Sequence, residues 1–208
     1  MIKVENIKVY NIARAVYSAR NAMNSWDKSD SDLENDVLGE ADLDLAHRLF
    51  VAGSPHRKFL RQCFVSMDIT APLYWISECD TYKVGTTRNS CSFMHKGMSK
   101  PFEISDFSTH TDGEDTLLMT DAAFKAVIDT LNGLRELYLE TKNDEVFQQI
   151  RCLLPSGYNQ RFTLTMTYEN VFNIINQRQN HRLSEWREFC EILKDLPYVR
   201  EIGGIEDE

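Results

Sequence analysis

The feature of this chain that most constrains its fold is a long amphipathic segment from Thr120 to Lys142. Its apolar residues recur at spacings of three and four, the period of an α-helix with one buried face. They are Phe124, Val127, Ile128, Leu131, Leu134 and Tyr138. Thr120 is a residue type that caps helix N-termini, so we predict a helix over residues 120–142. We assign its stripe to the hydrophobic core rather than to a cofactor site.

The other apolar patterns predict a few strands among several helices. A mixture of β-branched and polar residues predicts a strand at residues 2–12, and a period of two predicts strands at residues 59–70 and 161–167. Helix-forming composition or helical spacing predicts helices at residues 13–23, 42–51, 72–81, 145–153 and 168–179, and a last helix capped by Ser184. At 208 residues, 42% of them hydrophobic, the chain fits one domain with its own core. We expect a mixed α/β (α+β) fold, because strands and helices do not alternate regularly.

Charge and cysteine content limit the partners. The net charge of −9 disfavours binding along a nucleic-acid polymer, whose phosphates reward a basic face. No apolar run approaches the roughly 20 residues of a membrane span, and the N-terminus does not resemble a signal peptide. We therefore expect a cytoplasmic protein that binds neither membrane nor nucleic acid. The cysteines are scattered and odd in number, so we expect neither disulfides nor a metal site: Cys63, Cys79, Cys91, Cys152 and Cys190.

Acidic residues are concentrated between Asp27 and Asp44, where the only basic residue is Lys28. Residues 25–40 have no periodicity, and we expect a flexible loop or mobile flap there. This acidic segment is also a candidate for contact with a basic partner protein. Arginines cluster elsewhere in the sequence, so a globally acidic chain can still bind a small anionic ligand.

A polar run from Thr81 to Lys96 follows the apolar residues after Ala71 and contains one glycine and no proline. Loops that carry binding groups on a rigid scaffold have this composition. A run of hydroxyls and cations suits a phosphate, and the candidate ligand contacts are Lys83, Thr86, Thr87, Arg88, Asn89, Ser90 and Ser92. The alternative is a well-solvated surface loop.

Cys91 lies in the same polar run, three residues after Arg88. A nearby cation lowers a thiol pKa and increases the thiolate fraction, which makes Cys91 a candidate nucleophile. A single cysteine without a paired base is also compatible with an unreactive surface position.

Three segments together resemble the flavin-dependent thymidylate synthase family. In the first, Gly53, His56, a strand and Ala71-Pro72 follow the family's order. In the second, the positions of the family's Arg-His-Arg signature fall on Thr81, Tyr82 and Lys83, its Asn-Glu on Arg88-Asn89 and its second Ser on Cys91. In the third, the order and spacing of the family's C-terminal block are matched by Arg151, Leu154-Pro155, a strand, Asn173 and Arg178.

The resemblance implies a small central mixed sheet flanked by helices, assembled as a homotetramer whose sites are shared between subunits. It also implies FAD and dUMP as ligands, with Arg151, Asn173 and Arg178 among the contacts. Arg178 is the candidate for placing positive charge at the pyrimidine carbonyls. For Arg151 and Arg178 the alternative is an ordinary salt bridge, and His56 is either a turn residue or a neighbour of the flavin.

Three functions follow from these observations. The first is a nucleotide-binding protein on a flavin-dependent thymidylate synthase scaffold, with altered flavin-linked dUMP methylation. The second is a non-catalytic protein of phage or mobile-element type that sequesters or senses a nucleotide or another phosphorylated small molecule. The third is a structural interaction protein that uses the acidic segment.

Overall fold

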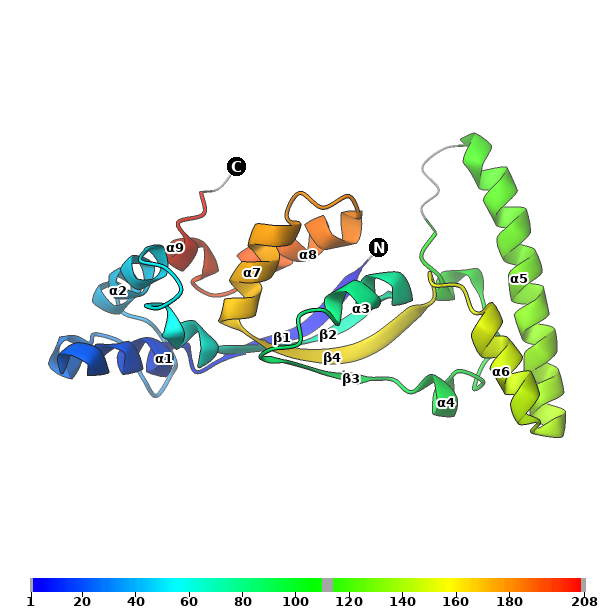
Figure 1. Ribbon diagram of the computed structural model, residues 1–208, viewed down its shortest axis with the longest axis horizontal. Helices are drawn as coiled ribbons and strands as arrows, with labels where there is room; N and C mark the ends of the chain where they lie inside the picture. Colours follow the sequence, from blue (N-terminus) through cyan, green and yellow to red (C-terminus); the bar gives the residue numbers. More distant parts are fainter. Residues whose placement is uncertain (1, 110–113, 207–208) are drawn as a thin grey trace. The chain divides into compact units, whose positions relative to one another are not determined.

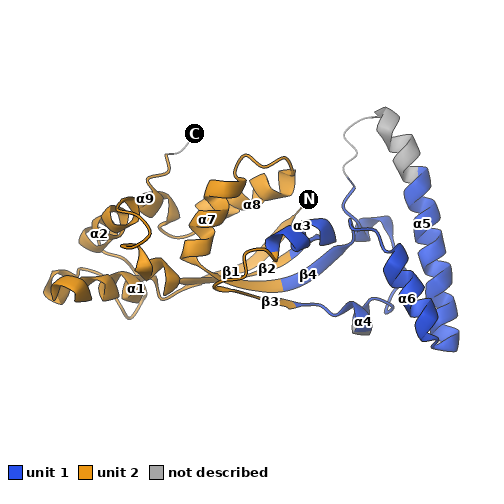
Figure 2. Ribbon diagram, viewed as in Figure 1, with its two compact units in different colours: residues 1, 70–79, 90–162 blue, residues 2–69, 80–89, 163–208 orange. Residues whose placement is uncertain are grey.

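A computed structural model describes residues 2–109 and 114–206. The chain divides into two compact units, which Figure 2 shows in different colours. Unit 1 contains residues 70–79 and 90–162, and unit 2 contains residues 2–69, 80–89 and those from 163 onward. The single-domain expectation stays a prediction.

A four-stranded antiparallel sheet has the strand order β1-β2-β4-β3. Its strands are β1 (Lys3–Tyr10), β2 (Phe64–Pro72), β3 (Thr86–Ser90) and β4 (Asn159–Thr167). The expected fold class and the small sheet among helices are confirmed. Strand β3 lies inside residues 81–96, so the prediction of a continuous loop there is wrong. It is an edge strand, and its sequence, TTRNS, has no apolar face that could mark it.

Strand β2 buries one face through alternate residues, because Val65, Met67 and Ile69 are all buried. The predicted strand over residues 59–70 begins too early, since Lys58–Arg61 form a 3-10 turn, η3, in which Phe59 and Leu60 are buried. Helix α3 (Leu73–Cys79) follows β2 directly and confirms the helix expected there.

The helices of unit 2 form two groups. Helices α7 (Tyr168–Arg178) and α8 (Ser184–Lys194) lie on the same side of the strands in Figure 1. Helix α1 (Ile12–Ala19) continues into the 3-10 turn η1 (Arg20–Met23), and α2 (Glu40–Val51) meets α9 (Val199–Gly203). Ser184 is the first residue of α8 rather than its cap, because the cap position is Leu183. Helix α9 was not expected, since five residues are too few to show a period.

The acidic segment is a loop tied to the start of α2, with one 3-10 turn, η2 (Trp26–Lys28). Asp42 is fully buried and accepts bonds from Arg20 Nε, at 2.6 Å, and from the hydroxyls of Ser29 and Ser31. Asp30 accepts the backbone amides of residues 41 and 42, and the bond from residue 41 is the main cause of its lowered pKa. Flexibility of this loop stays a prediction, and these bonds oppose it.

Unit 1 is built on the long helix α5 (Glu114–Thr141), which runs alongside α6 (Asp144–Leu153) in Figure 1. Leu131 of the predicted stripe belongs to the core cluster of unit 1, and the other stripe residues pack against this cluster, which confirms the assignment of the stripe as core. The other members of the cluster are Phe93, Met98, Phe102, Phe107 and Ile150. Helix α5 begins at Glu114, before the predicted cap Thr120, whose side chain lies outside the described residues. Short turns α4 (Phe93–Lys96) and η4 (Ile104–Asp106) complete the unit.

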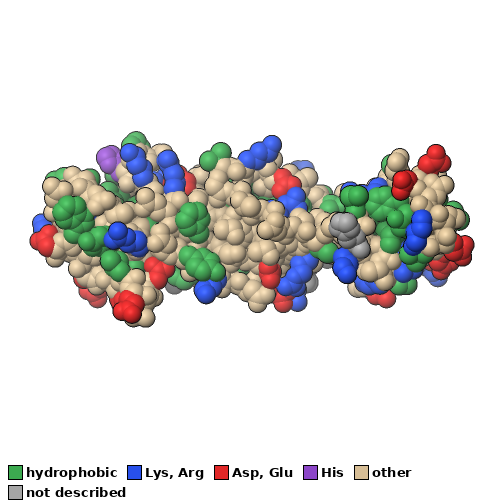
Figure 3. All heavy atoms as spheres, turned by 90° about the horizontal axis from the view of Figure 1, so that it is seen from below, with side chains coloured by type: hydrophobic (Ala, Val, Ile, Leu, Met, Phe, Trp, Pro, Cys, Tyr) green, Lys and Arg blue, Asp and Glu red, His purple; other side chains and the backbone are tan. Residues whose placement is uncertain are grey.

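No helix within residues 2–109 and 114–206 has the length and apolar character needed to cross a membrane. Figure 3 shows one face of the molecule, on which Lys and Arg side chains lie among Asp and Glu side chains. The expectation that no nucleic-acid polymer binds stays a prediction.

Candidate functional site

Residues 80–89, which we call the polar segment, belong to unit 2 and form a turn followed by most of β3, held by specific bonds. Arg88 forms a two-point ion pair with Asp80, with Nε–Oδ1 and Nη2–Oδ2 distances of 3.0 and 2.8 Å. Buried Asn170 of α7 donates from Nδ2 to the carbonyl of Val84, at 2.6 Å, and to Thr86 Oγ1, at 2.7 Å. Gly85 has a φ of 72°, a left-handed conformation that favours glycine. These bonds hold the backbone of the segment in a defined turn, although most of its side chains are exposed to solvent.

Arg178 meets this segment through Tyr82, and we call the group of Tyr82, Gln177, Arg178 and Trp186 the Arg178 centre. Arg178 Nε donates to Tyr82 Oη at 3.0 Å, and Tyr82 Oη donates to Gln177 Oε1 at 2.9 Å. The guanidinium carbon lies 4.9 Å from the centroid of the Trp186 ring and 5.8 Å from that of Tyr82. A hydrogen bond and two cation–π contacts thus fix the orientation of the guanidinium.

Tyr82 was absent from the predicted contact set, although it stands at the position of the signature histidine. Trp186 is fully buried in α8, and the sequence alone does not distinguish a buried Trp of the core from one that packs against a site. The structure adds both residues to the candidate site.

The remaining predicted residues of unit 2 lie in several places. Lys83, Thr87 and Asn89 are exposed along the polar segment, and Asn173 is half-buried on α7. His56 is exposed in the turn after α2 and lines a cavity of about 380 Å³ with Ser18, Asn21, Lys58 and Gln62, among others.

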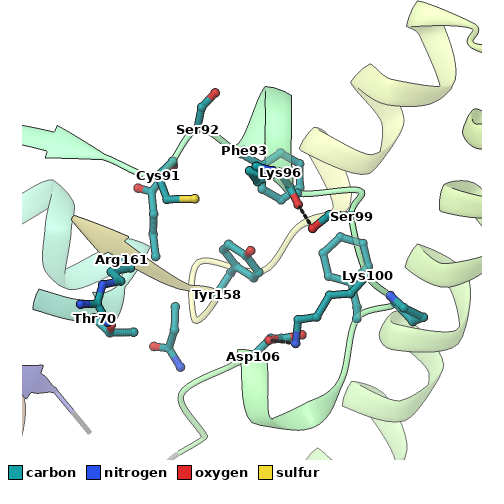
Figure 4. A pocket seen from close by; sticks show the side chains of 15 residues that line it. Thr70, Cys91, Ser92, Phe93, Lys96, Ser99, Lys100, Asp106, Tyr158 and Arg161 are labelled. Atoms are coloured by element: carbon teal, nitrogen blue, oxygen red, sulfur yellow. Dashed lines mark hydrogen bonds and ion pairs between the residues drawn. The ribbon is translucent and has the colours of Figure 1, made fainter.

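Unit 1 contains a separate group of predicted residues around a cavity of about 270 Å³, which we call the unit-1 pocket (Figure 4). Cys91 and Ser92 line it, and Figure 4 shows the Cys91 thiol pointing toward the Tyr158 ring. The backbone amide of Cys91 donates to the carbonyl of Arg161 at 2.8 Å, and Gln160 Nε2 donates to the carbonyl of Cys91 at 2.7 Å. Ser90, just before the pocket residues, is exposed at the end of β3.

Aromatic rings and cations form much of the wall of the unit-1 pocket. Phe93, Phe102 and Tyr158 pack together, with centroid separations of 5.6–6.3 Å. Lys100 Nζ donates to Asp106 at 2.7 Å, and this bond is the main cause of the raised pKa of Lys100. Burial, followed by the charge of Asp106, raises the pKa of the Tyr158 hydroxyl, so this group is protonated at neutral pH.

Arg151 belongs to unit 1, and its side chain stacks on an aromatic ring. Its guanidinium carbon lies 4.8 Å from the centroid of Phe93. Within unit 1, Arg151 therefore supports a wall of the pocket. Sequence reasoning missed most of this wall because residues 93–107 are irregular, and aromatic residues outside a helix or strand show no period.

A family model described as "Thymidylate synthase complementing protein" matches residues 4–197. The chain belongs to the flavin-dependent thymidylate synthase family. Two solved structures of the flavin-dependent thymidylate synthase ThyX from Helicobacter pylori, both with FAD and dUMP, have the same fold. Each is 17% identical to this chain, with TM-scores of 0.69 and 0.70. The alignments cover 96% and 97% of this chain and 96% of each ThyX chain. No curated protein matches.

The family implies FAD, and the contacts of the polar segment test whether the residues here fit it. Tyr82 is bonded within the Arg178 centre, and Arg88 is paired with Asp80. Where the resemblance implies two arginines and a glutamate, this chain has Thr81, Lys83 and Asn89, and of these three exposed residues only Lys83 is charged. This donor set does not fit the flavin contacts that the resemblance implies, and FAD binding stays a prediction. Among the described residues, no group of three or more His, Cys, Asp or Glu side chains could hold a metal ion.

Proposed function

We propose that this protein binds a pyrimidine nucleoside monophosphate through the Arg178 centre, and that nucleotide binding rather than methyl transfer is its function. The observation that supports it is the contact between Arg178 and the polar segment, in which Arg178 Nε donates to Tyr82 Oη at 3.0 Å. The fold supports it as well, since the two ThyX structures that share it hold dUMP.

The physical argument rests on preorganisation. Arg178 is half-buried, and its orientation is set by Tyr82 and Trp186, so a ligand that meets it costs little side-chain entropy. A planar guanidinium suits the carbonyls and phosphate of a nucleotide, and a charged hydrogen bond contributes about 1.5–3 kcal/mol. Lys83 directly follows Tyr82 and is exposed, so it supplies a second positive charge for the phosphate.

Isothermal titration calorimetry with dUMP tests this function. Arg178→Gln removes the charge and should weaken dUMP binding by roughly tenfold or more, which corresponds to the loss of one charged hydrogen bond. Arg182→Gln changes the same charge at an exposed position of unit 2 and should bind dUMP like the wild type. Deoxyuridine, which lacks the phosphate, should bind more weakly than dUMP. Unchanged affinity of Arg178→Gln, or no binding of dUMP by the wild type, would refute the proposal.

Flavin-linked methylation of dUMP is the second candidate, and the family match over residues 4–197 favours it. Its test is the flavin absorbance of the purified protein, before and after dialysis against FAD. A colourless protein that takes up no FAD would remove this candidate and leave nucleotide binding untouched.

We also propose that the protein assembles with copies of itself, as the resemblance implies. Light scattering coupled to size-exclusion chromatography measures the mass, which should be four times that of the 24.1 kDa chain. A monomer at micromolar concentration would refute it.

A further inference from the structure

We propose, on the basis of the proposed function of the Arg178 centre, that the polar segment does not bind FAD and that its polar groups are bonded within the chain instead, where they hold the turn and orient Arg178. Nucleotide binding then requires no flavin, and the second candidate function fails. Three features of the segment support this, namely its charge, the bonds of Tyr82 and its fixed backbone.

The charge that the segment offers to a flavin nucleotide is small. Of the positions at which the resemblance implies charged residues, Thr81 and Asn89 are neutral. One charged hydrogen bond corresponds to roughly tenfold or more in affinity, so the loss of two such partners weakens FAD binding by about a hundredfold or more. Lys83 keeps a positive charge, but its ammonium is a point charge and does not form the paired bonds that a guanidinium makes to a diphosphate.

The other cation of the segment, Arg88, is already paired. Its Nε and Nη2 donate to the two carboxylate oxygens of Asp80 at 3.0 and 2.8 Å. This is the same two-point geometry with which an arginine binds a phosphate, so a flavin diphosphate would have to displace the carboxylate. The displaced Asp80 would then face an anion, and the exchange yields little net affinity. Because Asp80 and Arg88 cancel, Lys83 alone sets the net charge of residues 80–89.

The hydroxyl of Tyr82, at the position of the signature histidine, is directed to the Arg178 centre. It donates its hydrogen to Gln177 Oε1 at 2.9 Å and accepts from Arg178 Nε at 3.0 Å. The Tyr82 ring centroid lies 6.1 Å from that of Trp186, so the ring is packed as well. A phenol has one hydrogen to donate, and Tyr82 can donate to a flavin only by giving up its bond to Gln177. Tyr82 therefore serves as a positioning residue for Arg178.

The backbone of the segment is fixed by Asn170, whose side chain is buried. Asn170 Nδ2 donates to the carbonyl of Val84 at 2.6 Å and to Thr86 Oγ1 at 2.7 Å, which uses both hydrogens of the amide. Between these residues, the carbonyl of Gly85 accepts the backbone amide of Thr167 at 3.0 Å. A rearrangement of the turn around a ligand would leave a buried amide without its partners, which is unfavourable. All these bonds lie within one chain, so contacts from further copies of the chain do not release them.

Titration of FAD with the purified protein, followed by flavin fluorescence, tests the proposal. It is performed with and without dUMP, and dUMP binding is measured by calorimetry on the same preparation. The expected result is no saturable change of flavin fluorescence at protein concentrations that are saturated by dUMP. Saturable FAD binding by the wild type would overturn the proposal and leave dUMP binding at Arg178 intact. Absence of dUMP binding would overturn the proposed function, while the FAD titration is read independently.

Two triple variants test whether the polar segment is the cause. Thr81→Arg, Tyr82→His and Asn89→Glu together restore the implied residues, and this variant should bind FAD at least about tenfold more tightly than the wild type. The matched control has the two charges exchanged, Thr81→Glu, Tyr82→His and Asn89→Arg, and should not bind FAD. Circular dichroism confirms that both are folded. Equal FAD affinities of the two folded variants would refute the assignment of the loss to this segment.

The positioning role of Tyr82 has a test that is independent of FAD. Tyr82→Phe keeps the ring and removes both hydrogen bonds, so it should weaken dUMP binding roughly 2- to 10-fold and shift the nuclear magnetic resonance signal of Arg178 Nε–H. Tyr138→Phe removes a hydroxyl from α5 of unit 1 and should change neither quantity. Wild-type dUMP affinity and an unshifted signal in Tyr82→Phe would overturn the positioning role.

Discussion

Replacing Asp42 with Asn should destabilise unit 2 strongly, because its carboxylate is the buried anchor of the acidic segment. Asp42 is 0% exposed, and its oxygens accept from Arg20 Nε at 2.6 Å and from the hydroxyls of Ser29 and Ser31 at 2.5 and 2.6 Å. Arg20 is itself only 7% exposed, so the substitution leaves a buried cation without its counter-charge. Breaking a buried ion pair by removing one partner costs about 3–5 kcal/mol.

Urea unfolding followed by circular dichroism measures this loss. In thermal unfolding of a chain of this size, each kcal/mol lost from the free energy of unfolding lowers Tm by roughly 2–4 °C, so Asp42→Asn should lower Tm by roughly 6–20 °C. The matched control is Asp44→Asn in the same helix. Its ion pair with Arg48 joins side chains that are 64% and 65% exposed, and its loss should cost about 0.5 kcal/mol or less. Limited proteolysis should also cut residues 25–40 of the Asp42→Asn variant faster. A loss below about 1 kcal/mol, or equal effects of the two substitutions, would refute the reasoning.

Three further predictions concern the polar segment, helix α5 and high pH. Gly85→Ala should lower the free energy of unfolding in urea by about 1–2 kcal/mol, since φ is 72° and the added Cβ would lie 3.1 Å from Thr167 Cγ2. Gly133→Ala, in open helical surroundings, should instead raise it by about 0.5–1 kcal/mol. A change of the same sign for both variants would contradict this prediction. Asn170→Ala leaves the Val84 carbonyl and the Thr86 hydroxyl without their donor and should cost about 1–3 kcal/mol, with faster hydrogen exchange of residues 82–88, and native-like exchange there would argue against it. Burial raises the pKa of Cys190 from 9.0 to about 11, so on raising the pH the thiol ionises first in the unfolded chain. The contribution of the neutral thiol to the free energy of unfolding is therefore complete below about pH 9. Between pH 9 and 11 the free energy of unfolding falls by up to about 1.4 kcal/mol per pH unit. Cys190→Ala should flatten that slope, and parallel slopes for the two proteins would count against the assignment.

The helices of the fold were predictable because each long one carries an apolar stripe. The stripe of α5 predicts its packing, and residues such as Leu131 and Ile150 are buried as their spacing requires. Strand β3 could not be found in this way, since an edge strand gains its stability from backbone bonds to a neighbour and needs no apolar face.

The candidate site was predictable only where the resemblance reached it. Arg178 contacts the polar segment through Tyr82, a residue outside the predicted contact set. Arg88 is a predicted ligand contact, but its guanidinium is bonded to Asp80, which limits its availability to a ligand. The sequence did not show this pairing, because a partner eight residues away leaves no recognisable pattern. The aromatic wall of the unit-1 pocket comes from irregular segments between residues 93 and 158, whose proximity only the tertiary fold establishes.

The nuclear magnetic resonance signal of the Arg178 Nε–H group is the most direct test of the central claim, that Arg178 contacts a bound nucleotide. The signal is assigned by its absence from the spectrum of Arg178→Gln. It should shift progressively as dUMP is added and reach a plateau at the same concentration as the calorimetric titration. A signal that stays in place while dUMP saturates the protein would contradict the assignment of nucleotide binding to Arg178.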